Sequence, residues 1–149
     1  GIQRNYETAV SWFRMAAEQG VAHAMTHLSI CYYAGLGVEY NPREAFDWAL
    51  RAAEHGTPAS MRDLGRFYLA GETVPRDLSA AAHWFRKGAE FGSPEAMVDL
   101  AQCYWDGLGV EKDLKQAESW FQKAAELGYT FAIERLNILR SAVEPLTIH

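Results

Sequence analysis

The sequence has few of the features that mark a disulfide-stabilised, membrane-spanning or nucleic-acid-binding protein. Only two of its 149 residues are cysteine, too few for a disulfide framework. No apolar run approaches the roughly 20 residues that a membrane-spanning helix needs. Acidic residues outnumber lysine and arginine by 19 to 14, for a formal net charge of -5, and no basic cluster offers phosphate groups a binding surface. We therefore expect no membrane insertion and no nucleic-acid binding.

Motifs that would indicate an enzyme are also missing. The sequence contains no Walker A loop, H-E-x-x-H, C-x-x-C, G-x-S-x-G or S-x-x-K, the patterns that place phosphate-binding backbone, zinc ligands or an activated nucleophile. Gly35-Leu36-Gly37 is an isolated G-x-G that follows no strand pattern, so it does not predict a dinucleotide site. We predict a protein that is not an enzyme and that binds no cofactor.

What the sequence does contain is an internal repeat with a period of 36 residues. Several residue types recur at this interval, which indicates repeated structural units. The recurring residues are Trp12, Trp48, Trp84 and Trp120; Gly20, Gly56, Gly92 and Gly128; Leu28, Leu64, Leu100 and Leu136; Tyr32, Tyr68 and Tyr104; and Gly35, Gly71 and Gly107. Because the tryptophans recur without variation, we expect them to pack in the core.

Each repeat carries the pattern of two amphipathic helices, called A and B in chain order. In the first complete repeat, apolar residues recur at the spacing that one face of a helix requires. They are Ala24, Met25, Leu28, Cys31 and Tyr32 for helix A, and Ala45, Trp48, Ala49, Ala52 and Ala53 for helix B. Asn41-Pro42 is typical of a helix start. The closely spaced Gly35 and Gly37 are typical of the turn between the two helices.

These residues resemble the Sel1-like repeat family, a relative of the tetratricopeptide repeats with the pattern A…LG..Y..G.GV…D..KA..W…AA..G. The resemblance implies an all-α fold, a right-handed α/α superhelical solenoid of 36-residue helix-turn-helix repeats. We predict one domain over residues 1–149, with a partial repeat at 1–21, complete repeats at 22–57, 58–93 and 94–129, and a C-terminal helix and tail at 130–149. The first helix is expected at about 5–19. Thr73 replaces the second turn glycine of the family, so we expect a less regular turn there.

The two cysteines bear on the compartment. Cys31 and Cys103 stand at the same position of two repeats that are not adjacent, which separates them by more than the roughly 7 Å that a disulfide allows between Cα atoms. Reduced thiols favour a cytoplasmic location. We expect no signal peptide in the first residues of the given sequence, but the sequence opens on a B helix without its A helix, so we expect that a signal peptide or further repeats could have preceded it. A periplasmic or secreted location is therefore the alternative.

One metal-binding hypothesis needs to be weighed. His23, His27 and Cys31 are spaced i, i+4 and i+8 on the first A helix, which can place metal ligands on one face. Against this, Cys31 stands at a packing position, where a free cysteine acts as a small apolar residue. The residues at the position of His27 in the later repeats are Asp63, Asp99 and Arg135. They suggest a solvated outer face, so we predict no metal site.

A second face of helix A varies between repeats, whereas its packing stripe is nearly constant. A partner presents different groups to each repeat, so we expect binding on this variable face, and the resemblance implies that A helices line the concave side. The predicted partner-binding residues are Thr26, Ile30, Tyr33, Arg62, Arg66, Leu69, Val98, Gln102 and Trp105. Tyr33, Leu69 and Trp105 would form an apolar ladder along this face. Arg62 and Arg66, at its centre, would meet an acidic group of the partner. The alternative is that these side chains only pack against neighbouring A helices.

The sequence as a whole predicts a protein–protein interaction adaptor or scaffold. A solenoid offers an extended groove, which suits a peptide or a loop of a protein partner. The alternative is an immunity-type or inhibitor-type protein that blocks a specific enzyme or toxin with the same groove, a use that the resemblance also allows.

Overall fold

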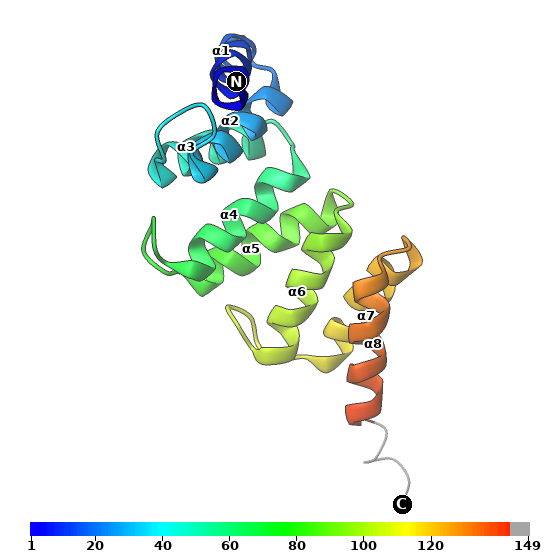
Figure 1. The fold of residues 1–149 in the computed structure, drawn as a ribbon. Coiled ribbons are helices and arrows are strands. Elements are labelled where there is room, and N and C mark those ends of the chain that lie inside the picture. The colour runs from blue at the N-terminus through cyan, green and yellow to red at the C-terminus, as the bar shows by residue number, and fades with distance from the viewer. Residues whose placement is uncertain (144–149) are drawn as a thin grey trace, which may run out of the picture.

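The computed structural model describes residues 1–143, and the regular secondary structure in that range is helical (Figure 1). In chain order the helices are α1 (Ile2–Glu18), α2 (Ala22–Ala34), α3 (Pro42–Glu54), α4 (Pro58–Ala70), α5 (Leu78–Glu90), α6 (Pro94–Asp106), α7 (Leu114–Glu126) and α8 (Thr130–Val143). The even-numbered helices are the A helices and the odd-numbered ones are the B helices. The predicted all-α solenoid is confirmed, and the predicted tail beyond Val143 lies outside the described residues.

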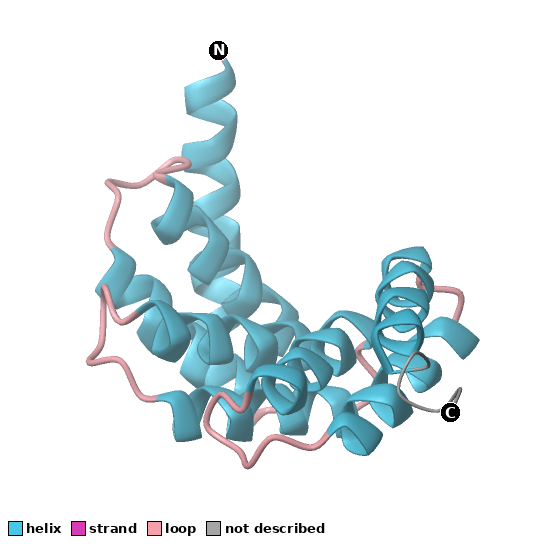
Figure 2. Cartoon of the chain, turned by 90° about the horizontal axis from the view of Figure 1, so that it is seen from below, coloured by secondary structure: helices cyan, strands magenta, loops and turns pink. Residues whose placement is uncertain are grey.

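The helices stack in chain order along a curved path (Figure 2). Successive A helices bond directly to each other: Thr26 Oγ1 lies 2.9 Å from Ser60 Oγ, and Arg62 is paired with Asp99 across 2.6 Å. Within the described residues, no side-chain bond joins successive B helices. Because the inner layer of a curved stack is the shorter one, its helices lie closer together. The A helices therefore line the concave side.

Small residues on the A helices make room for large ones on the B helices. Phe85 is 2% exposed, and a Cβ added at Gly65 would come within 2.4 Å of its ring, so close packing requires the glycine. In the preceding repeat, Ser29 takes the place of Gly65 and Ala49 takes the place of Phe85. A glycine on the A helix thus accompanies a phenylalanine on the B helix, and a larger residue on the A helix accompanies a smaller one on the B helix.

The turns from A to B explain the paired glycines of the repeat. Gly37 and Gly109 both have a left-handed backbone with φ of 71°. A Cβ at Gly109 would stand 1.9 Å from the carbonyl oxygen of Leu78, so the turn packs directly on the backbone of the preceding B helix and excludes a side chain. Thr73 occupies this position in the middle turn and does not have a positive φ. That turn consequently follows a different path, in line with the expected irregularity.

Two expectations from the sequence are wrong in detail. α1 begins at Ile2 rather than near residue 5, because residues 2–5 contain no glycine or proline to stop the helix. Trp12 is 66% exposed, whereas the other three repeat tryptophans are half-buried, each with a basic side chain from three positions further on over its ring. The expected packing thus holds for Trp48, Trp84 and Trp120, which lie against the edge of the core, and fails for Trp12.

The remaining features limit where function can reside. Cys31 and Cys103 are buried free thiols, and burial raises the pKa of Cys103 to about 11, which keeps it protonated and unreactive at neutral pH. In the described part of the chain, no helix has both the length and the apolar character needed to cross a membrane.

Candidate functional site

A pocket of about 240 Å³ opens on the concave face between α2 and α4. Its apolar lining comes from Ile30, Tyr33 and Phe67, together with two alanines. Glu72 and Thr73 of the irregular middle turn also line it. We call it the first-step pocket, since α2/α4 is the first step between neighbouring complete repeats; α4/α6 and α6/α8 are the second and third steps.

The apolar part of the first-step pocket is a cluster of aromatic rings. Tyr33 is 54% exposed and meets Phe67 edge-to-face, with ring centroids 5.6 Å apart. Phe67 in turn meets Phe46 in the same geometry at 5.5 Å. Phe67 stands where the neighbouring repeats have Cys31 and Cys103. This larger residue gives the first step an aromatic surface that the equivalent positions of the other repeats do not provide.

Three charged residues surround this aromatic surface: Asp63, Arg66 and Glu72. Asp63 is half-buried, and burial raises the pKa of its carboxyl, an effect that Arg66 and then Arg62 partly offset. Its side chain has no hydrogen bond or ion pair within the described residues. The solvated face predicted for this repeat position agrees with the exposure of His27 but does not extend to Asp63, which lies between two A helices on the concave side.

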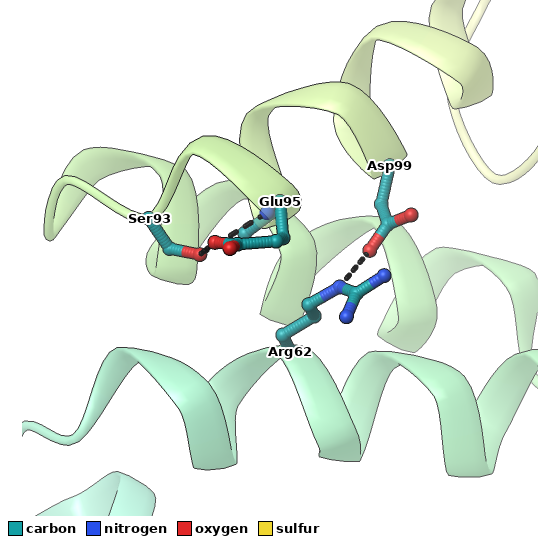
Figure 3. A network of polar contacts seen from close by, with 5 residues as sticks. Arg62, Ser93, Glu95 and Asp99 are labelled. Atoms are coloured by element: carbon teal, nitrogen blue, oxygen red, sulfur yellow. Dashed lines mark hydrogen bonds and ion pairs between the residues drawn. The ribbon is translucent and has the colours of Figure 1, made fainter. Parts of the chain in front are cut away.

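In the second step, an ion pair joins the two A helices (Figure 3). Asp99 stands one repeat after Asp63, and Arg62 Nε donates a hydrogen bond to Asp99 Oδ2 across 2.6 Å. The two side chains are 31% and 24% exposed. Burial raises the pKa of Asp99, and the hydrogen bond from Arg62 partly offsets this. Arg62 is engaged within the chain, which corrects the prediction that it meets an acidic group of a partner.

In the third step, an arginine stands at the repeat position of Asp63 and Asp99, and Val98 stands at the position of Arg62. The guanidinium of Arg135, on α8, lies over the ring of Trp105 with 5.3 Å between the guanidinium carbon and the ring centroid. The same guanidinium donates a hydrogen bond to Gln102. Trp105 also meets Phe121 edge-to-face at 6.0 Å. The chain itself thus supplies a cation to the aromatic residue of this step.

The structure separates the nine predicted binding residues into two groups. Ile30, Tyr33 and Arg66 come together in the first-step pocket. The others bond or pack within the chain: Thr26 and Arg62 between A helices, Leu69 against the core, Val98 in the core with 6% exposure, and Gln102 and Trp105 around Arg135. The predicted ladder is therefore not a continuous binding surface, and Val98 is not accessible to a partner.

The residues of the metal-binding hypothesis have separate environments. Cys31 is buried, His23 is exposed, and His27 stacks on Phe13 with 4.8 Å between ring centroids. Across residues 1–143, no three potential metal ligands come together. His27 is thus an exposed residue whose ring rests on Phe13.

Comparison with known families accounts for the repeated helix pairs. The Sel1 repeat model matches residues 1–21, 22–57, 58–93 and 94–129. The chain belongs to the Sel1 repeat family. Members of this family generally mediate protein–protein interactions and are typically scaffolds without enzymatic activity. No curated protein matches this Sel1 repeat chain.

Solved structures share its fold over most of its length. The protective antigen c5321 of uropathogenic Escherichia coli is 35% identical, with a TM-score of 0.86, and the match covers 93% of this chain but 30% of c5321. A Sel1 repeat protein from Oxalobacter formigenes is 37% identical over 84% of this chain and 94% of its own, with a TM-score of 0.79. The immunity protein Pa5087 from Pseudomonas aeruginosa is 26% identical over 91% of this chain and 51% of its own, with a TM-score of 0.63.

Sequence reasoning found three of the residues that line the pocket in this Sel1 repeat chain and missed the others, of which Asp63, Phe67, Glu72 and Thr73 distinguish this step from the next. Two of them carried a signal, because Phe67 replaces a repeated cysteine and Thr73 replaces a repeated glycine. For Asp63, the signal was a comparison with Asp99 at the same repeat position. An arginine, Arg62, stands 37 residues before Asp99, whereas Thr26 stands 37 residues before Asp63. Departures from the repeat, rather than its variable face as a whole, point to the pocket.

Proposed function

We propose that this Sel1 repeat chain is a protein-binding module that holds a peptide or a loop of a partner on its concave face, with the first-step pocket as the anchor point. The observation that carries the proposal is the exposed ring of Tyr33 beside an apolar pocket with charged residues around it. An exposed aromatic beside an arginine is typical of the residues that dominate binding energy at protein interfaces. The proposal assigns the chain no catalytic activity.

Selection of peptides tests this proposal without knowledge of the natural partner. We expect the immobilised chain to enrich a common motif from random peptides displayed on phage, and Tyr33→Ala or Ile30→Ala, which both remove exposed apolar surface of the pocket, to abolish that enrichment. Phe91→Ala is the matched control, because Phe91 is 58% exposed but lies outside the pocket. Enrichment that survives both pocket variants would place the binding surface elsewhere. A complete lack of enrichment would count against peptide binding.

A second candidate function has one observation in its favour. The immunity protein Pa5087 shares the fold over 91% of this chain, so an immunity-type or inhibitor-type role on the same face is the alternative proposal. It differs from an adaptor in its effect on the partner. An inhibitor forms a one-to-one complex in which the activity of the partner enzyme or toxin is lost, whereas an adaptor leaves that activity in place. An activity assay of a co-purified partner, with and without stoichiometric chain, distinguishes the two roles.

A further inference from the structure

The three steps of the concave face differ in whether the chain supplies a guanidinium group between the two A helices, and from which helix. In the second step Arg62 provides it to Asp99, and in the third step Arg135 provides it to Trp105. In the first step the residue equivalent to Arg62 is Thr26, whose hydroxyl bonds to Ser60 instead. Asp63 is therefore the counterpart of Asp99 without the arginine that pairs with it.

We propose that the first-step pocket receives an arginine or lysine side chain of the partner, with its alkyl chain against Tyr33 and Phe67 and its cation at Asp63 and Glu72. This inference rests on the proposed function and specifies the chemistry of the ligand. The partner side chain would give the first step the cation that the chain itself supplies to Asp99 in the second step and to Trp105 in the third.

The charge of the pocket agrees with a basic rather than an acidic ligand. Asp63 and Glu72 contribute two negative charges, and Arg66 contributes one positive charge. Because Arg62 is paired with Asp99, an acidic ligand would find one available guanidinium and two carboxylates in the pocket. A carboxylate that is half-buried and unpaired is unfavourable. A cationic ligand relieves this cost for Asp63, whereas an acidic ligand would increase it.

The size and surface of the pocket also agree with a single side chain. Its volume of about 240 Å³ is below the roughly 300–1,000 Å³ of typical small-molecule sites. The rings of Tyr33 and Phe67 offer the type of surface on which alkyl chains and guanidinium groups pack. The third step shows that the A-helix layer of this chain accommodates a guanidinium over an aromatic ring, because Arg135 occupies such a place on Trp105.

Titration with side-chain probes tests this inference directly. We expect the N-acetyl methylamide of arginine to shift the amide NMR signals of Ile30, Phe67 and Glu72 in the ¹⁵N-labelled chain. The leucine probe should bind at least about fivefold more weakly, since it lacks the charge interaction. The glutamate probe should produce no saturable shifts. Equal or tighter binding of the leucine or glutamate probe would overturn the inference.

Three variants identify the groups responsible. Asp63→Asn should weaken binding of the arginine probe at least about fivefold, and Glu72→Gln by a smaller factor, while Glu54→Gln, exposed on α3, is the control without effect. Thr26→Arg should abolish probe binding, because it supplies Asp63 with a guanidinium from the same position as Arg62. Circular dichroism verifies that each variant is folded.

The outcomes separate this inference from the proposed function. If Asp63→Asn and Thr26→Arg both bind the arginine probe as the wild type does, the assignment of the cation to Asp63 is wrong. If no probe shifts the pocket signals, the inference is also wrong, although phage-selected peptides that depend on Tyr33 would still support a protein-binding pocket. Selected peptides without a basic residue, bound at Tyr33, would likewise overturn the inference and leave the proposed function in place.

Discussion

The first and second steps of the concave face place the same residue type at the same repeat position and give it different surroundings. Asp99 accepts a hydrogen bond from Arg62 across 2.6 Å, whereas Asp63 lines a pocket of about 240 Å³ and has no side-chain partner within the described residues. Burial raises the pKa of both carboxyls. The helices that carry them have the same length and the same type of start. The difference lies in one residue of the preceding A helix, Thr26 or Arg62.

This comparison shows how a regular repeat acquires a local binding site. The repeat fixes the backbone through its glycines, caps and small core residues, so each step presents the same positions. Side chains at those positions decide whether a step is satisfied internally or open to a partner. An open step leaves a polar group without a partner inside the protein, and this lowers the stability of the fold. Such a loss of stability is common at functional sites. Four predictions test the comparison, from the largest expected effect to the smallest.

The largest difference in stability is expected between substitutions in two of the A-to-B turns. Gly109→Ala places a Cβ against the carbonyl oxygen of Leu78 in a left-handed backbone, so we expect the free energy of unfolding to fall by about 3 kcal/mol. Thr73→Ala, at the same position of the middle turn, should change it by less than about 0.5 kcal/mol. Urea unfolding followed by circular dichroism measures both. Equal losses would mean that the middle turn packs as the others do.

The aromatic surface of the first step should be the next most sensitive feature. Phe67→Cys introduces the residue found in the neighbouring repeats and removes the ring contacts with Tyr33 and Phe46, so we expect a loss of about 2 kcal/mol in unfolding free energy. The same unfolding experiment measures it. Tyr33→Ala is the companion variant: its ring is 54% exposed, so its loss should be below about 1 kcal/mol. A reversal of that order would show that Tyr33 is structural.

Most of the fold followed from the sequence, because its determinants are local and repeated. The paired glycines of the A-to-B turns, the caps such as Asn41 and the apolar stripes of both helices each require a particular backbone, so they predict helix pairs in every repeat. The expectation failed for Trp12, since burial of a tryptophan depends on a neighbouring helix and not on its own spacing.

The candidate site was less predictable, because it depends on contacts between A helices one repeat apart. The variable positions were identified, but a variable position can equally be satisfied within the chain, as Arg62 and Gln102 are. Arg62 and Asp99 pair only if the Arg62 side chain is long enough to reach Asp99. A prediction of this pair therefore needs the distance between α4 and α6. The sequence alone does not provide that distance, so it could not separate the open first step from the closed second one.

Conversion of the second step into the first should have an intermediate effect. Arg62→Thr leaves Asp99 half-buried without its hydrogen-bond donor, so we expect a loss of about 1–2 kcal/mol in unfolding free energy. Addition of Asp99→Asn should recover part of that loss, because the uncompensated charge is then removed. A double-mutant cycle from urea unfolding measures the coupling. If the two changes were simply additive, the ion pair would not stabilise the step.

Removal of the unpaired charge from the first step should have the smallest effect and the opposite sign. The folded state raises the pKa of Asp63 above its ordinary value of 3.8 through burial, with Arg66 and Arg62 partly opposing it. The folded state therefore binds the proton more tightly than the unfolded state, and the contribution of Asp63 to stability declines as pH rises through the interval between the two pKa values. At pH 7 the ionised carboxylate costs stability.

Asp63→Asn should raise the melting temperature at pH 7 by about 1–2 °C, and this gain should shrink as the pH falls and Asp63 becomes protonated in the wild type. Thermal unfolding at a series of pH values measures this, with Glu54→Gln as the control. A variant less stable than the wild type at pH 7 would show that Asp63 has a stabilising partner within the chain, and the contrast with Asp99 would then be lost.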